Sequence, residues 1–164
     1  MTSASDHHAK AIRPNPPGGV FDGPVHLYAV RVYYEDTDLS GIVYHANYLR
    51  WFERARSDVL RMLGIDQRAA IESGGGAYAV ADVQLRYLRP ALLDDDIVIH
   101  TRCSELKAAS VRMDQEAKRD GETICTARLR VGFVAPNGRP RRQPEAWRDA
   151  FKTVLDTTSQ GEHA

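Results

Sequence analysis

The sequence predicts an α+β domain in which one long helix packs against an antiparallel sheet. An alternating apolar segment, Val25 to Tyr34, is followed by a helical apolar stripe over residues 46–63, and the later segments return to a period of two. One face of the sheet must be buried, and this helix is the only large element available to cover it. Because one helix cannot cover a whole sheet, we also expect a partner subunit.

Length and composition exclude several classes of protein. The chain has 164 residues, 43% of them hydrophobic, and its 22 basic residues balance its 22 acidic ones. This balance predicts no general attraction to nucleic acid or anionic membranes. No apolar run approaches the roughly 20 residues of a membrane span, and the N-terminus lacks the apolar stretch of a secretion signal. We therefore expect a cytoplasmic protein without an integral membrane segment.

Composition also suggests where the domain begins and ends. Residues 1–23 are rich in Pro, Gly and Ser and predict a flexible arm, residues 24–156 predict the folded domain, and residues 157–164 predict a disordered tail. The two cysteines, Cys103 and Cys125, lie in β-like segments and indicate neither a disulfide framework nor a metal-ligand cluster.

The helices are read from apolar residues about one turn apart. The long helix is expected at residues 46–63, with Gly64 placed to end it, and a short helix at residues 66–72 follows. A third, short helix is expected to open at Pro144. The stripe of the long helix comprises Tyr48, Phe52, Ala55, Val59 and Leu63, and that of the third helix Trp147, Phe151 and Leu155.

Four strands are expected after the second helix. The first changes the parity of its apolar residues, so we predict a β-bulge near Ala81 and Asp82. Asp120 and Gly121 form a good tight-turn signal between the last two strands. The four strands are predicted at residues 78–88, 97–106, 110–118 and 122–135.

The segment from Tyr34 to Tyr48 carries the strongest chemical signal. It places two carboxylates, Asp36 and Asp38, with Gly41 and His45 just before the predicted long helix. The free N–H groups at a helix N-terminus carry partial positive charge and stabilise an oxyanion, while a carboxylate attacks a carbonyl or activates water. An Asp before a helix is also often only a cap. We expect the capping or structural role for Asp36.

These residues resemble the signature of the YbgC-type acyl-CoA thioesterases, kin of the 4-hydroxybenzoyl-CoA thioesterases. The resemblance covers roughly residues 30–136, and it implies the hot-dog fold, in which an antiparallel sheet wraps a long helix. One departure is Leu39-Ser40, where relatives often have small residues. The resemblance to the family rests on the motifs Tyr34-Glu35-Asp36-Thr37-Asp38, Gly41, Val43-Tyr44-His45, Tyr48 and Glu53-Arg54-Ala55-Arg56.

The resemblance implies roles for individual residues. Asp38 is the expected catalytic carboxylate, assisted by His45 and Tyr44, although Tyr44 also suits a packing role. Gly41 lets the chain bend, and the backbone of residues 44–46, Ala46 included, is the expected oxyanion donor. Glu53 is the alternative carboxylate, because some related thioesterases use one from this helix.

The resemblance also implies a ligand and an assembly. The expected substrate is an acyl-CoA, without a metal or redox cofactor, and the expected assembly is a homodimer or homotetramer. Lys107 and Ser110 in one turn are the candidate CoA-binding residues, as are Arg139, Arg141 and Arg142. Two alternatives stay open: a non-catalytic module that binds acyl-CoA or acyl-carrier protein, and a hot-dog hydratase or dehydratase.

Overall fold

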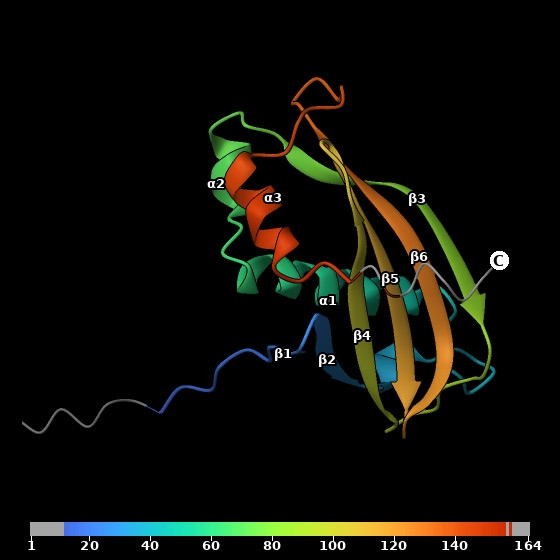
Figure 1. Ribbon diagram of the computed structural model, residues 1–164. Helices are drawn as coiled ribbons and strands as arrows, with labels where there is room; N and C mark the ends of the chain where they lie inside the picture. Colours follow the sequence, from blue (N-terminus) through green and yellow to red (C-terminus); the bar gives the residue numbers. More distant parts are fainter. Residues whose placement is uncertain (1–11, 157, 159–164) are drawn as a thin grey trace, which may run out of the picture.

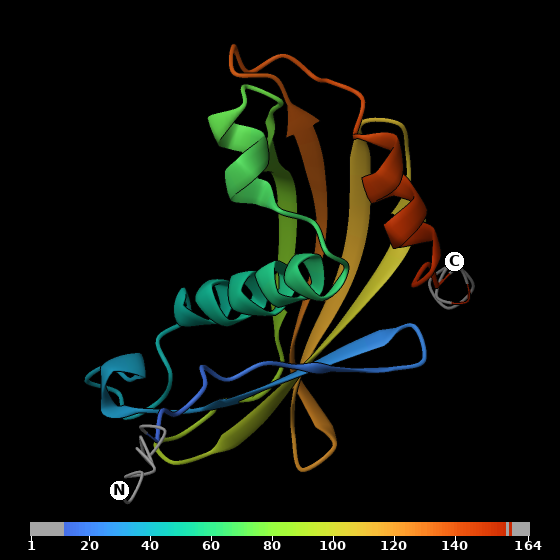
Figure 2. The ribbon, with the colours of Figure 1, turned by 90° about the vertical axis from the view of Figure 1, so that its left-hand side faces the viewer.

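One antiparallel sheet that curves around a long helix forms the body of the protein. The computed structural model describes residues 12–156 and 158. Its six strands follow the order β1-β2-β4-β5-β6-β3, and helix α1 lies across the concave face (Figures 1 and 2). The strands are β1 (Val20–Asp22), β2 (Val25–Arg31), β3 (Ala77–Tyr87), β4 (Asp96–Leu106), β5 (Ser110–Arg119) and β6 (Glu122–Val134). The helices are the 3-10 helix η1 (Tyr34–Asp36), α1 (Asn47–Met62), α2 (Gln67–Glu72) and α3 (Glu145–Lys152). The predicted α+β architecture is confirmed.

Helix α1 supplies the centre of the core. Phe52 and Ala55 are fully buried, and Trp51 is 1% exposed. They belong to the same apolar cluster as Ile97 and Ile99 of β4, which are also fully buried. Burial of such side chains contributes roughly 1.5–3 kcal/mol each. The bounds of α1 match the predicted helix to within one residue at each end.

The strands after α2 follow the predicted pattern. The register of the β3–β6 pair shifts between Val80 and Asp82, which confirms the expected bulge. The turn between β5 and β6 has positive φ at both Asp120 and Gly121, as its sequence indicates. The inward face of β6 buries Cys125, Ala127 and Leu129, in agreement with the predicted alternation.

Three boundaries differ from the predictions. The strand expected from Val25 to Tyr34 ends at Arg31, because Tyr34 enters η1. Strand β1 lies inside the predicted arm of residues 1–23, since it pairs with β2. Leu155 lies beyond α3 and forms a bridge with Cys103. The predictions for residues 1–11, 157 and 159–164 lie outside the described residues.

One edge of the sheet leaves apolar side chains exposed. Strand β3 is an edge strand, and Val80, Val83 and Tyr87 on it are 52%, 42% and 48% exposed. Exposed edges with apolar side chains favour pairing with another chain. Within the described part of the chain, no helix is long and apolar enough to cross a membrane.

Candidate active site

Asp36 fixes the loop that precedes α1. Its side chain is 8% exposed; one carboxylate oxygen accepts a hydrogen bond from the Tyr33 N–H and the other from the Asn47 side-chain amide, both at 2.8 Å. Since Asn47 is the first residue of α1, Asp36 ties η1 to the start of the helix. This carboxylate is therefore occupied, and Asp36 has the expected structural role.

Asp38 lies two residues later and is exposed to solvent. Its Oδ1 accepts hydrogen bonds from the Ser40 N–H, at 2.8 Å, and from the Ser40 hydroxyl. The Ser40 hydroxyl, the Ser40 amide and the neighbouring His45 lower the pKa of Asp38. Asp38 is therefore a carboxylate at neutral pH, held in a fixed orientation by the turn.

Gly41 makes this turn possible. Its N–H donates to the Asp38 carbonyl at 3.0 Å, and its φ of 81° lies in the left-handed region that glycine adopts without steric cost. The next residues return the chain to the body, since the Val43 N–H donates to the Ala91 carbonyl at 2.9 Å. The turn thus presents Asp38 outward while its ends stay anchored.

The backbone just before α1 presents free donors. The Tyr44 N–H donates to the Asp36 carbonyl at 2.8 Å, so it is already occupied. For the amides of His45 and Ala46, the described residues offer no hydrogen-bond acceptor, and Ala46 caps α1 without a side-chain hydrogen bond. Of the three backbone N–H groups expected to bind an oxyanion, those of residues 44–46, only the N–H groups of His45 and Ala46 are therefore free among the described residues. Such free N–H groups are suited to an oxyanion.

His45 is exposed, and aromatic rings surround it. The Tyr44 ring packs edge-on against it with centroids 4.6 Å apart, and the Tyr87 ring lies 6.3 Å away. The Tyr87 hydroxyl donates to the His45 carbonyl at 2.8 Å. Tyr44 thus packs against His45, and Tyr87 of β3 fixes its backbone.

The candidate CoA-binding residues lie elsewhere. Lys107 lies in the turn between β4 and β5, and Ser110 is the first residue of β5; both are at the end of the sheet opposite the loop that carries Asp38 (Figure 2). Strand β4 has 11 residues and so separates these ends by about 35 Å. The Lys107 ammonium pairs with Glu105 at 3.3 Å, and Arg141 donates to two loop carbonyls, those of Gly74 and Gly75. One chain therefore does not bring these cations to Asp38.

Comparison with known proteins identifies the family. The model of the thioesterase superfamily matches residues 40–126, which is more than half of the chain. The chain belongs to the thioesterase superfamily. The matched segment begins at residue 40, just after Asp38, and contains Gly41, His45 and all of α1.

Individual relatives specify the branch of the superfamily. The acyl-CoA thioesterase YbgC of Haemophilus influenzae is 40% identical over 107 residues, which cover 65% of this chain and 79% of that protein. The acyl-CoA thioester hydrolase YbgC of Escherichia coli O6:H1 is 35% identical over 127 residues, which cover 76% and 94%. The structure of a probable thioesterase from Bartonella henselae has a TM-score of 0.69 at 36% identity and covers 73% of this chain and 99% of that one. The protein is a YbgC-type thioester hydrolase with the hot-dog fold.

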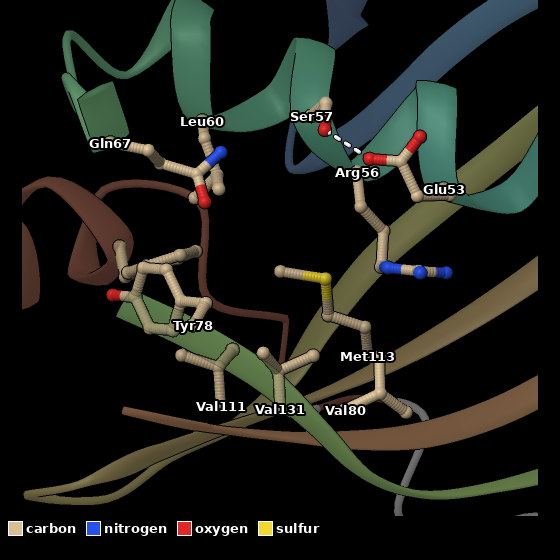
Figure 3. Close-up of a pocket in the computed structure, with 11 residues that line it drawn as sticks. Glu53, Arg56, Ser57, Leu60, Gln67, Tyr78, Val80, Val111, Met113 and Val131 are labelled. Atoms are coloured by element: carbon tan, nitrogen blue, oxygen red, sulfur yellow. Dashed lines mark hydrogen bonds between the residues drawn. The ribbon is translucent and has the colours of Figure 1, made fainter. Parts of the chain in front are cut away.

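Two hollows of this thioesterase lie along α1 rather than at Asp38. An open groove of about 440 Å³ has Leu49 in its lining, and a cavity of about 150 Å³ lies between α1 and the sheet (Figure 3). Both are lined by Glu53, Arg56 and Val80. Glu53 is exposed, and its carboxylate accepts a hydrogen bond from the Ser57 hydroxyl at 2.5 Å. The alternative carboxylate thus lines both hollows, whereas Asp38 lines neither.

Sequence patterns missed two residues of the site. Ser40 holds the Asp38 carboxylate, and Tyr87 holds the backbone of His45. Serine two residues after aspartate is a recognisable signal for a side-chain-to-backbone turn. Tyr87 offered no local signal, since 42 residues separate it from its partner.

Proposed function

We propose that this protein hydrolyses acyl-CoA thioesters to a carboxylic acid and free CoA, with Asp38 as the catalytic carboxylate. The observation that carries the proposal is an exposed, oriented carboxylate that interacts with His45, followed by two unused backbone N–H groups just before α1. The names of the Haemophilus influenzae and Escherichia coli relatives support acyl-CoA as the substrate.

Two reaction routes use this geometry. In the first, Asp38 attacks the thioester carbonyl and expels CoA thiolate, which takes up a proton, and water then hydrolyses the resulting mixed anhydride. In the second, Asp38 removes a proton from water, whose oxygen attacks the carbonyl directly. A single turnover in labelled water tests the two routes. Label in Asp38 demonstrates the anhydride, since water has then opened it at the Asp38 carbonyl. Label in the product alone favours the base, or an anhydride that water opens at the acyl carbon.

The N–H groups of His45 and Ala46 stabilise the oxyanion in both routes. A preorganised donor of this kind is worth about 3 kcal/mol of transition-state stabilisation. The His45 ring, next to Asp38, assists by donating a hydrogen bond to the substrate or by orienting water, and Tyr44 supports that ring.

The proposed substrate requires an oligomer. We infer that a second copy pairs along the β3 edge, where Val80, Val83 and Tyr87 are exposed, and thereby completes the site. In such an assembly, CoA bound at Asp38 of one subunit places its phosphates near Lys107 and Ser110 of a neighbouring subunit. Size-exclusion chromatography with light scattering tests this proposal, and a monomer at working concentration would contradict it. A cytoplasmic location stays a prediction.

Thiol release from a panel of acyl-CoAs tests the proposed activity. The panel contains short, long and aromatic acyl groups, and a thiol-reactive dye records free CoA. Saturable binding without thiol release would support the binding module instead, and a hydrated acyl-CoA as product would support the hydratase.

The protein's own thiols are predicted to stay silent in this assay. Both cysteines are buried, and burial raises the pKa of Cys103 and of Cys125 to about 12. Because the thiolate is the reactive form, the folded protein alone should not react with the dye at pH 8, and both thiols should react in denaturant. Rapid reaction of the native protein would contradict this burial.

Ser40→Ala should move the acid limb of the pH–activity profile to higher pH. Ser40 lowers the pKa of Asp38, and the variant loses its hydroxyl donor but keeps the backbone one. Activity that needs the carboxylate is present above this pKa and is lost as the pH falls through it. The wild type should therefore stay active at lower pH than the variant. kcat/KM measured against pH checks this, and an acid limb that does not move would argue against a limiting ionisation of Asp38.

A further inference from the structure

Arg56 places a positive charge between α1 and the sheet. Its side chain lines both the groove and the cavity, and the guanidinium extends beneath Glu53 rather than toward Leu60 and Gln67 (Figure 3). Burial lowers the pKa of Arg56, yet arginine stays protonated in proteins. The structure therefore holds a permanent, partly desolvated cation at the junction of the two hollows.

This cation forms no ion pair with a carboxylate of the described chain. The Arg56 Nη1 donates to the Gln115 side-chain carbonyl at 2.9 Å, and that neutral group is its one hydrogen-bond partner among the described residues. No carboxylate of residues 12–156 or 158 lies within ion-pair distance of Arg56. The charge of the Glu53 carboxylate raises the pKa of Arg56, but this carboxylate accepts its hydrogen bond from the Ser57 hydroxyl and none from the guanidinium. Buried charges are normally paired, so this arrangement suits an anion from outside the chain.

Gln115 holds the guanidinium in place. Its side-chain amide donates to the Phe52 carbonyl at 3.0 Å and to the Thr101 hydroxyl at 2.9 Å, and it is 1% exposed. All of its polar atoms are thus engaged, so its carbonyl stays aimed at Arg56. A preorganised guanidinium recognises a carboxylate through two parallel hydrogen bonds.

The hollows connect this cation to the free amides. Leu49, three residues after Ala46, lines the groove, and Arg56 lines both the groove and the cavity. Ten residues of helix span about 15 Å, and helical side chains lean toward the N-terminus, which shortens the distance to the guanidinium. The cavity of about 150 Å³ is roughly the size that holds a benzene-sized group.

We propose that Arg56 selects acyl groups whose far end carries a carboxylate, so that the preferred substrates are thioesters of short dicarboxylic acids. The inference rests on the proposed thioesterase function. The acyl chain lies along α1 in the groove, with its thioester carbonyl at the His45 and Ala46 amides and its far carboxylate at Arg56. Apolar side chains such as Val80, Met113 and Val131 line the cavity together with polar ones, and Arg56 is the one basic residue among the described residues that line it. The Glu53 carboxylate, which also lines the cavity, accepts a hydrogen bond from the Ser57 hydroxyl.

Matched pairs of substrates test the proposal. Succinyl-, glutaryl- and adipyl-CoA are compared with butyryl-, valeryl- and hexanoyl-CoA, and the spontaneous hydrolysis of each is subtracted. The wild type should prefer the diacid member of at least one pair. Arg56→Gln should lower kcat/KM for that diacid about tenfold or more, because it loses a charged hydrogen-bonded pair, and should change the neutral partner little.

Two further variants separate charge from structure. Arg56→Lys keeps the positive charge but loses the two parallel N–H groups of the guanidinium. Its kcat/KM for the diacid should lie between those of the wild type and Arg56→Gln. Arg61→Gln removes an exposed arginine of the same helix that lines neither hollow, and it should leave the diacid preference unchanged. Thermal melting and light scattering of every variant show whether fold and assembly are retained.

The possible results separate a failure of the selectivity proposal from a failure of the thioesterase proposal. If no thioester is hydrolysed, the thioesterase proposal itself fails. If neutral thioesters are hydrolysed as well as diacids and Arg56→Gln affects both equally, the selectivity proposal is overturned. If Arg56→Gln changes the oligomeric state, a carboxylate of the second copy is the partner of Arg56, which also overturns it.

Discussion

Asp38→Asn should reduce thiol release at least about a thousandfold on every substrate that the wild type hydrolyses. Asparagine preserves the shape of the side chain and still accepts hydrogen bonds from Ser40, but it neither attacks a carbonyl nor removes a proton from water. Asp38 is exposed and its side-chain hydrogen bonds are both to Ser40, so the fold should be unaffected. Stopped-flow or steady-state thiol release measures the loss, and circular dichroism checks the fold.

Glu53→Gln is the matched control for this result. Glu53 is also an exposed carboxylate near the start of α1, and it lines the groove and the cavity. If Asp38 is the catalytic carboxylate, Glu53→Gln should retain most of the activity. The reverse pattern, in which Asp38→Asn stays active and Glu53→Gln is inactive, would move the chemistry to the helix and refute the proposed role of Asp38.

Local periodicity explains why most elements could be predicted. Helix α1 follows from the spacing of residues such as Phe52 and Ala55, and the bulge in β3 follows from the parity change at Ala81. Strand β1 could not be read in this way, because three residues are too few for a periodic signal. Its one local signal is Gly23, whose φ of 57° allows the two-residue turn into β2.

The candidate site could be proposed from the sequence because several of its residues are contiguous. Asp38, Gly41 and His45 lie within one short segment, and the proposed donors, the N–H groups of His45 and Ala46, lie just before the helix that follows. The Tyr44 N–H donates to the Asp36 carbonyl, so it is not available to a substrate. Only the folded loop brings these two groups together, and the sequence alone did not reveal this. Whether Arg56 forms an ion pair depends on all the side chains that surround it in the fold, so the spacing of residues in the sequence does not reveal it.

Helix α1 also anchors the N-terminal hairpin through a buried pair. One Asp58 carboxylate oxygen accepts hydrogen bonds from His26 Nε2 and from the Gly19 N–H, both at 2.8 Å. His26 is fully buried and Asp58 is 5% exposed. His26 Nδ1 has no partner among the described residues, so the network places the ring proton on Nε2. At Gly19, an added Cβ would collide with the His26 ring, which explains the glycine.

Asp58→Ala should therefore destabilise the protein by about 3 kcal/mol, because it leaves the buried His26 ring and the Gly19 N–H without their acceptor. For a chain of this length, that loss lowers Tm by roughly 10 °C. Strand β1 should also lose protection against amide exchange before the rest of the sheet, since this pair joins its start to α1. Calorimetry and hydrogen exchange measure the two effects.

Asp149→Ala is the control, because it removes an exposed carboxylate that pairs with Lys152. This variant should change the free energy of unfolding by less than about 0.5 kcal/mol. Equal Tm values for the two variants would show that the buried pair adds nothing to the stability of the fold.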